Sequence, residues 1–247
     1  MTATAIGWIT PDWPLAGQVN VVSTLRAGGV SEGPYASLNL AAHVGDRPEA
    51  VAANRLLMRE AVHLPAEPLW LEQVHGVDVV RHGQVATGVR ADASVAFEPG
   101  RVCAVMTADC LPVVLADRAG TRVAVAHAGW RGLLGGVLEA TVAGLGGEAA
   151  ELHAWLGPAI GPDAFEVGAE VREGYAARFP GSEASFVRNE RGRYLADLYG
   201  LARLVLGRAG IGAVHGGGWC THGDPGRFFS FRRDGVTGRM ATLAWLA

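Results

Sequence analysis

The sequence predicts one α+β domain built on a mixed β-sheet or on a pair of sheets. Stretches with β character outnumber stretches with helical spacing, and the two kinds do not alternate strictly along the chain. A doubly wound fold, in which strands and helices alternate, therefore fits poorly. Since no internal repeat, low-complexity tract or linker divides the chain, we expect a single domain over residues 1–247.

The first third of the chain predicts a strand, a long loop and a helix. Residues 18–25 have the apolar, β-branched character of a strand. A loop rich in Gly, Ser and Pro follows up to Asp46, and loops of that length in compact domains are often functional. Asp46 is expected to be the N-cap of a helix over 47–62, with Pro48 in its first turn. Further expected strands are the two short ones within 68–81 and one at 91–97.

Residues 102–134 form the block around which the rest of the chain is organised. Its expected elements are strands at 102–108, 111–117 and 122–128 and a helix at about 130–145. Reactive side chains interrupt these apolar runs, with Asp109 and Cys110 between the first two strands and His127 at the end of the third. A charged residue in such surroundings costs free energy unless it is paired or functional. We therefore expect chemistry at these strand ends.

The C-terminal part of the chain contributes the remaining helices and strands. These are a strand running from Leu152 into a Gly- and Pro-rich turn, helices at 168–179 and 197–209, and strands at 227–233 and 239–246 joined by a turn at Asp234-Gly235. Trp70 and Trp155 are expected in the core. Core packing is also expected for Phe228, Phe229 and Phe231, with one of the three exposed for stacking.

Composition and charge exclude several kinds of partner. The formal net charge is −3, the sequence pI is about 6.2 and no cluster of Lys or Arg forms a track for a phosphate backbone, so no nucleic acid partner is expected. We expect no secretory signal, because the first residues show no basic segment followed by an apolar core, and no apolar run of 18 or more residues predicts a membrane span. Three cysteines, an odd number, do not form a disulfide framework, so a reducing cytoplasm is the expected compartment.

Two imidazoles and a thiol are the candidates for a metal site. His75, Cys110 and His127 offer the donor set of a catalytic zinc site with an open fourth position, where zinc lowers the pKa of a bound water to about 7. Their spacing matches no short metal-binding motif. Cys110 as a small buried hydrophobe is one alternative. Cys110 as a nucleophile with His127 as its base, for acyl transfer without metal, is another, and composition does not separate them.

Arginines and the other cysteines complete the list of candidates. Arginine suits planar, bidentate capture of phosphate or carboxylate. Arg26 opens the Gly-rich loop, Arg131 follows His127, and three more arginines occur near the end of the chain at positions 232, 233 and 239. Each is also compatible with a solvated loop position. Cys103 is expected to be inert in a strand, and Cys220 to be a reduced thiol in a surface loop.

Several long motifs resemble those of the YfiH/YlmD family, and the resemblance runs from about Thr10 to the last residue. The motifs are RAGGVSEGPYASLNLAAHVGD, WLEQVHG, VMTADCLPV, AHAGWRG, WLGPAIGP and FFSFRRDG. Members of this family are variously described as purine nucleoside phosphorylases, laccase-domain polyphenol oxidases or peptidoglycan editing factors. The resemblance implies packed mixed β-sheets with outer helices. It also implies a zinc site made by His75, Cys110 and His127.

The same resemblance implies two reactions on purine nucleosides. One is phosphorolysis of adenosine, inosine and 5′-methylthioadenosine to the free base and ribose-1-phosphate, and the other is deamination of adenosine. Asp109 is our candidate for the acid that handles the leaving ammonia, or for a residue that orients a metal ligand. Arg26 and Arg131 are the expected phosphate anchors, with Asn39 and Gln73 as polar contacts to sugar or base.

Other functions stay open at this point. A multicopper oxidase usually takes its copper ligands from His-x-His pairs, and the chain has eight histidines and no such pair, so only a single copper at the same three ligands is compatible. A metal-free Cys–His hydrolase or amidase acting on muropeptide-type substrates is a second hypothesis. A third is a non-enzymatic accessory protein that binds a cell-wall precursor or its enzyme.

Overall fold

The apolar strands of the central block lie in the middle of a six-stranded sheet. The computed structural model describes residues 5–15 and 17–247. The strands, in sheet order, are β12 (Ala213–Gly216), β8 (Leu152–Leu156), β6 (Leu111–Asp117), β7 (Val123–Ala128), β4 (Ala93–Ala96) and β3 (Val79–Arg81). The outer pairs β12/β8 and β3/β4 are parallel and the inner pairs are antiparallel, so the sheet is mixed. Every residue of β6 and β7 is buried, which explains their continuous apolar character.

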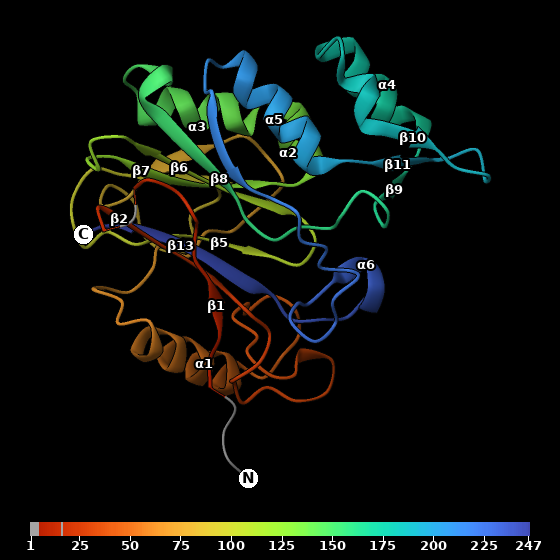
Figure 1. Ribbon diagram of the computed structural model, residues 1–247. Coiled ribbons are helices and arrows are strands. Elements are labelled where there is room, and N and C mark those ends of the chain that lie inside the picture. The colour runs from red at the N-terminus through yellow and green to blue at the C-terminus, as the bar shows by residue number, and fades with distance from the viewer. Residues whose placement is uncertain (1–4, 16) are drawn as a thin grey trace.

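A second, antiparallel sheet packs against one face of the first (Figure 1). Its order is β1 (Trp8–Ile9), β2 (Val19–Thr24), β13 (Met240–Leu246) and β5 (Cys103–Thr107). The last strand of the chain therefore lies between β2 and β5. Side chains from both sheets, including Val21, Val105, Val125 and Trp155, form one apolar cluster between them. This cluster is the middle layer of the molecule.

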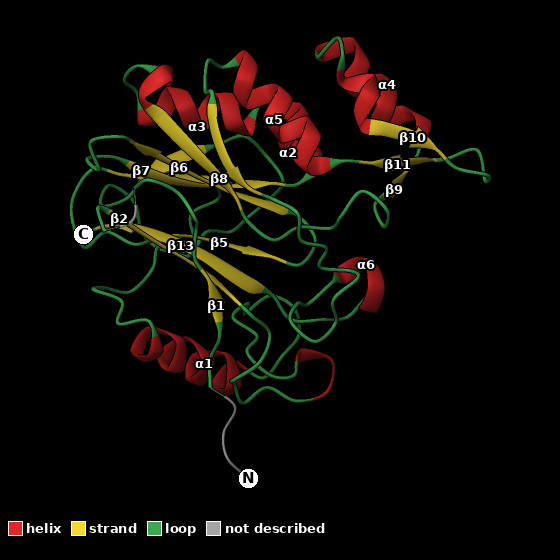
Figure 2. Ribbon diagram, in the orientation of Figure 1, coloured by secondary structure: helices red, strands yellow, loops and turns green. Residues whose placement is uncertain are grey.

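Helices cover the outer faces of the two sheets (Figure 2). The helices are α1 (Pro48–Ala61), α2 (Trp130–Gly135), α3 (Val137–Leu145), α4 (Ala169–Arg178), α5 (Leu198–Arg208) and α6 (Phe231–Asp234). Helices α3 and α5 pack on the six-stranded sheet, and α1 lies on the far side of the four-stranded one. A small third sheet of β10 (Phe186–Arg188), β11 (Tyr194–Ala196) and β9 (Glu166–Val167) stands beside α4. None of the described helices is long and apolar enough to cross a membrane.

This architecture confirms the predicted α+β fold of packed mixed sheets with outer helices. The three central strands, the strand at 18–25 and the last strand occur where the apolar patterns predicted them. Trp70 and Trp155 are buried, as are Phe228 and Phe229, whereas Phe231 is the exposed phenylalanine at 58%. The strands β1 and β12 and the third sheet were not predicted.

Two of the predicted elements near the central block and the C-terminus are wrong. The single helix over 130–145 is two helices, because Gly136 adopts φ 108° and ends one helix while beginning the next. Glycine adopts this left-handed conformation without a steric penalty. The strand over 227–233 is instead a turn and a short irregular segment leading into the short helix α6, where the Ser230 hydroxyl accepts a hydrogen bond from the Arg233 N–H and caps the helix.

Two smaller expectations in the first third also need correction. The N-cap of α1 is Arg47, and the Asp46 carboxylate instead accepts hydrogen bonds from the Ser31 hydroxyl and the Asn39 amide. Of the two strands expected within 68–81, only β3 is a regular strand. The segment before it contributes isolated bridges, one of them between Leu69 and Cys103.

Candidate metal and substrate site

Three segments that are distant in the sequence converge at one end of the six-stranded sheet. Cys110 lies in the turn between β5 and β6, directly after Asp109, whose φ is 97°. His127 lies near the end of β7, in register with Pro112 of β6, which brings the imidazole next to the start of β6. His75 lies in the loop before β3, at φ 59°. The antiparallel pairing of β6 and β7 thus places the thiol beside the His127 imidazole, and the loop before β3 brings the His75 imidazole to the same point.

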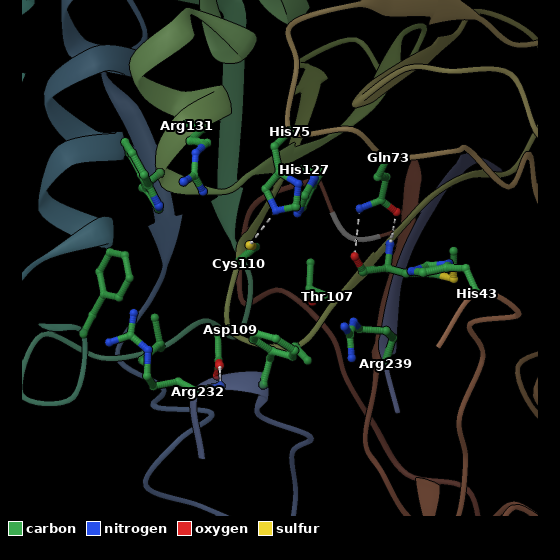
Figure 3. Close-up of a pocket in the computed structure, with 16 residues that line it drawn as sticks. His43, Gln73, His75, Thr107, Asp109, Cys110, His127, Arg131, Arg232 and Arg239 are labelled. Atoms are coloured by element: carbon green, nitrogen blue, oxygen red, sulfur yellow. Dashed lines mark hydrogen bonds between the residues drawn. The ribbon is translucent and has the colours of Figure 1, made fainter. Parts of the chain in front are cut away.

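The three side chains form a compact donor set (Figure 3). One ligand atom from each of His75, Cys110 and His127 lies within 4.8 Å of the others. The Cys110 Sγ is 3.7 Å from the His75 Nε2, and the two imidazole centroids are 4.7 Å apart at 71°. His127 is buried, Cys110 is partly buried and His75 is exposed. The cluster therefore has one side in the protein interior and one side facing out.

Electrostatics in this cluster favours the thiolate. Burial alone would raise the pKa of Cys110, but the charge and hydrogen bonds of His127 and His75 outweigh it and lower the pKa to about 6. Burial alone would lower the pKa of His127, but Cys110 and Asp92 outweigh it and raise the pKa to about 9. The thiolate is the form of cysteine that binds metals and attacks electrophiles.

A buried carboxylate supports both imidazole-bearing segments. Asp92 directly precedes β4, and its Oδ1 lies 2.8 Å from the Nδ1 of His127. The backbone N–H groups of Val74, His75 and Gly76 also donate to this carboxylate. Burial raises the pKa of Asp92, but these hydrogen bonds outweigh it and leave the pKa below its usual value. The group is therefore a carboxylate at neutral pH.

Close approach of the thiol and the His75 ring requires a glycine beside them. A Cβ atom at Gly129 would lie 2.9 Å from the Cys110 Sγ and 3.0 Å from the His75 Cδ2. Gly129 is the N-cap of α2 with φ −62°, which any residue adopts. The requirement for glycine is therefore steric and concerns only the space around the two candidate ligands.

The donor set fits a transition metal. Zinc in catalytic sites is commonly held by three protein ligands drawn from imidazole and thiolate, with a fourth position open to solvent or substrate. Copper also accepts imidazole and thiolate, so the ligand types alone do not select one metal. The residues present and their mutual distances are thus suited to one ion of this class, with His75, Cys110 and His127 as its ligands.

A cavity of about 450 Å³ opens on this cluster. Sites for small molecules commonly have volumes of roughly 300–1,000 Å³. The cavity is lined by the cluster itself, by apolar and aromatic side chains including Trp130, Phe165 and Phe231, and by the polar residues His43, Gln73, Thr107, Asp109, Arg131, Arg232 and Arg239. Three guanidinium groups around one cavity indicate an anionic ligand or co-substrate.

Arg239 and Arg131, two of these arginines, differ in how tightly they are held. Arg239 is half-buried, and its Nη1 donates to the carbonyls of Thr237 and Gly238. Burial lowers the pKa of its guanidinium, with Cys110 and Asp109 acting in the other direction, but arginine stays protonated at neutral pH. Arg131 is exposed and lies over the Trp130 ring at 4.3 Å.

Two expected site residues line the cavity with their polar atoms already paired. Asp109 accepts hydrogen bonds from the Thr221 hydroxyl and the Arg232 N–H, both at 2.6 Å. The Gln73 amide exchanges two hydrogen bonds with the backbone of Met106, both at 2.8 Å. Both residues are part of the cavity wall, and Asp109 fixes the α6 end of that wall to the β5–β6 turn.

Arg26 and Asn39 are not among the residues that line the cavity. The Arg26 guanidinium donates to the carbonyls of Ala36, Pro225 and Phe228. Asn39 is fully buried, and its side-chain carbonyl accepts from the backbone N–H groups of Ala41 and Arg239. Because both side chains hold loops together, the substrate contacts expected for them find no support in this geometry.

The other two cysteines lie outside the donor set. Cys103 is fully buried in β5, and burial raises the pKa of its thiol to about 12, as expected of an inert thiol. The Cys220 Sγ accepts from the backbone N–H groups of Gly161 and Gly223, each at 3.3 Å. All three cysteines are free.

Comparison with known proteins identifies the family. The family described as multi-copper polyphenol oxidoreductase laccase matches residues 20–247. The chain belongs to this family. It is 55% identical to a purine nucleoside phosphorylase of Pseudomonas aeruginosa over 97% of this chain and 98% of the relative. It is 53% identical to the purine nucleoside phosphorylase YfiH of Escherichia coli over 96% and 98%.

Solved structures of the family share the fold. A Neisseria meningitidis protein aligns with a TM-score of 0.93 at 51% identity, covering 97% of this chain and 98% of that one. YlmD from Geobacillus stearothermophilus aligns with a TM-score of 0.90 at 31% identity, covering 98% and 97%. The predicted resemblance to the YfiH/YlmD family is thereby confirmed.

Two site residues had no role in the sequence predictions. Asp92 is one, and the signal that could have found it is a lone carboxylate immediately before the apolar strand β4. His43 is the other, and it lines the cavity. Burial and the charges of Arg239 and Arg55 lower the pKa of His43, so its ring is neutral at pH 7. No local sequence pattern distinguishes His43 from other surface residues. The sequence singles out Arg239 only as one of several arginines near the end of the chain that suit capture of an anion.

Proposed function

We propose that this protein is a zinc-dependent purine nucleoside phosphorylase acting on adenosine, inosine and 5′-methylthioadenosine. The observation that carries the proposal is the His75–Cys110–His127 cluster at the end of a cavity lined by three arginines. Relatives at 53–55% identity bear the name purine nucleoside phosphorylase. A small apolar cavity with a few polar and cationic groups suits a nucleoside together with phosphate.

The residues around the cavity have different roles in the proposed reaction. Among the described residues, Arg239 uses only Nη1 for backbone contacts, which leaves Nε and Nη2 to donate to a phosphate, and Arg131 lies on the opposite wall as a second anchor. Trp130 and Phe231 offer ring faces for the base. Zinc bound by His75, Cys110 and His127 supplies Lewis-acid polarisation. The cavity wall formed by Gln73 and Asp109 orients the ligand and limits access of water.

Adenosine deaminase activity belongs to the same proposal. It requires a group that delivers a proton to the leaving ammonia. Asp109 is the candidate because its carboxylate lies in the cavity wall next to Cys110. It would take a proton from the attacking water and pass that proton to the leaving ammonia. Free cysteines throughout the chain support a reducing compartment such as the cytoplasm for this enzyme.

The decisive measurement is the phosphate requirement. Protein purified without chelators is expected to carry about one zinc per chain and to release adenine and ribose-1-phosphate from adenosine only when phosphate is present. Equal release of adenine without phosphate would identify a hydrolase instead. Formation of inosine from adenosine, followed separately, reports the deaminase activity.

A metal-free cysteine hydrolase is the second candidate, and a specific observation favours it. The lowered pKa of the Cys110 thiol beside the raised pKa of His127 is the thiolate–imidazolium pair that cysteine nucleophiles use. Amidase activity on a muropeptide-type substrate that survives a zinc chelator but is lost in Cys110→Ser would support it. Loss of all activity on chelation, with recovery when zinc is restored, would exclude it.

Replacing Arg239 by Ala is expected to weaken phosphate binding. A hydrogen bond to a charged partner contributes about 1.5–3 kcal/mol, which corresponds to a rise in the KM for phosphate of roughly 10- to 100-fold. Zinc content and the KM for adenosine should change far less, because Arg239 is not one of the metal ligands. Steady-state kinetics at varied phosphate measures this.

Arg90→Ala is the matched control for that substitution. Arg90 is exposed and lies 3.9 Å from the Glu72 carboxylate, and it is not among the residues that line the cavity. Its removal should leave the KM for phosphate unchanged. An Arg239→Ala variant that behaves like Arg90→Ala would remove Arg239 from the anchor role and leave Arg131 as the candidate.

A further inference from the structure

Asp92 is the most completely paired carboxylate near the cluster. Its side chain is fully buried. Oδ1 lies 2.8 Å from the His127 Nδ1 and 2.9 Å from the His75 backbone nitrogen. Oδ2 lies 2.7 Å from the Gly76 nitrogen and 3.2 Å from the Val74 nitrogen. A carboxylate offers about four lone-pair directions, so these four donors fill its capacity.

One of these contacts selects the form of the His127 ring. A carboxylate only accepts hydrogen bonds, so the His127 Nδ1 must carry the proton. In the neutral ring the lone pair is then on Nε2, the nitrogen available to the cluster with Cys110 and His75. A backbone contact adds to this, since the His127 N–H donates to the Asp92 carbonyl at 2.7 Å. Asp92 thus fixes both the position and the tautomer of His127.

The other three contacts fix the loop that carries His75. His75 is exposed and has a φ of 59°, a conformation that non-glycine residues rarely adopt. Three consecutive N–H groups of this loop, from Val74, His75 and Gly76, converge on the one carboxylate. Without the Asp92 carboxylate, these three N–H groups would converge on one place with no acceptor for their hydrogen bonds. Asp92 therefore connects a ligand on a rigid strand to a ligand on a loop.

We propose that Asp92 is the positioning residue that assembles the metal-binding form of the site, holding His127 with Nε2 unprotonated and His75 within reach of the same ion. This inference rests on the proposed zinc site but not on the reaction. Carboxylates that orient metal-bound imidazoles typically change metal affinity by roughly 10- to 100-fold when they are removed. Here one carboxylate acts on two ligands, so the effect should lie at the upper end of that range.

Asp92→Asn is the sharpest test because the amide cannot serve both groups. If the amide oxygen is turned toward Val74 and Gly76, the amide NH₂ group faces the His127 Nδ1. This favours the His127 ring form with the proton on Nε2, and a protonated Nε2 cannot bind metal. With its oxygen toward His127, its NH₂ group faces two N–H donors and the 74–76 loop is released. Both orientations damage the donor set.

Asp117→Asn is the matched control. Asp117 is also a buried carboxylate, at 5% exposure, and it holds a turn by accepting from the N–H groups of Thr121 and Arg122 and from the Thr121 hydroxyl. The substitution removes comparable hydrogen bonds at the other end of β6. It should lower the unfolding temperature without changing the affinity for zinc.

Two measurements test the inference. The first is the zinc affinity of the full-length protein, measured by competition with a chromogenic chelator. The second is ¹⁵N NMR of the zinc-loaded wild type. We expect a protected Nδ1–H on His127 in the wild type, and a roughly 100-fold loss of zinc affinity in Asp92→Asn but not in Asp117→Asn. A wild-type His127 with its proton on Nε2, or an Asp92→Asn variant that folds and binds zinc within twofold of the wild type, would overturn the inference.

The wild-type NMR measurement still tests the tautomer of His127 if the Asp92→Asn variant does not fold. A protein that binds zinc in the expected form but releases no base from adenosine refutes the proposed function and leaves this inference standing.

Discussion

Replacing Cys110 by Ala is expected to abolish both zinc binding and phosphorolysis while the protein stays folded. Cys110 supplies the only thiolate of the donor set, so its loss leaves two imidazoles. Removing a direct ligand should reduce activity by more than the roughly 100-fold typical of outer residues. Because Cys110 is partly exposed in a turn and belongs to none of the apolar clusters, the free energy of unfolding should fall by less than about 1 kcal/mol.

Cys220→Ala provides the matched control for that experiment. Its thiol is also partly buried and lies in a loop, but within residues 5–15 and 17–247 it accepts hydrogen bonds only from the backbone N–H groups of Gly161 and Gly223. Zinc content by atomic emission and turnover with phosphate should both match the wild type. A Cys110→Ala protein that retains one zinc would show that the ion is held elsewhere, and the proposed site would have to be abandoned.

The parts of the fold that were predictable are those in which burial decides the structure. Strands β6 and β7 are buried on both faces, so their apolar runs are recognisable without further information. The segment 227–233 misled because three phenylalanines in five residues give it the aromatic character of a strand. Its structure is decided by the Ser230 cap and by the contact of the Arg232 N–H with Asp109, a residue 123 positions away. Such long-range contacts leave no local pattern.

The candidate site was predictable by residue type but not by geometry. His75, Cys110 and His127 were identified from their chemistry and motifs, yet only the pairing of β6 with β7 brings the last two together. Arg26 and Arg239 are equivalent in sequence terms. The structure distinguishes them, because the carbonyls of Ala36 and Pro225 occupy the Arg26 guanidinium while Arg239 lines the cavity.

Gly129→Ala is expected to impair the site without unfolding the protein. The added Cβ would lie 2.9 Å from the Cys110 Sγ, closer than real Cβ atoms approach a neighbour, and 3.0 Å from the His75 Cδ2, which is closer than in most real contacts. At least one of the two ligands must therefore move. Displacements of about 1 Å at a catalytic centre cost roughly 10²-fold in rate. We therefore expect kcat/KM for phosphorolysis to fall by about that factor, together with a weaker affinity for zinc. The backbone at Gly129 suits alanine, so the free energy of unfolding should fall by only about 1 kcal/mol, for a poorer N-cap.

Gly207→Ala separates this steric effect from the general effect of replacing a glycine. Gly207 lies within α5, and a Cβ there would meet no atom of the described part of the chain within 4 Å. Alanine in a helix is more stable than glycine by about 0.5–1 kcal/mol, so this variant should unfold at a slightly higher temperature and keep full activity. If Gly129→Ala also keeps full activity and zinc affinity, the 74–76 loop must yield easily. The His75 side chain would then not need to be held closely against Cys110, and the tight donor set on which the metal site depends would lose its main geometric support.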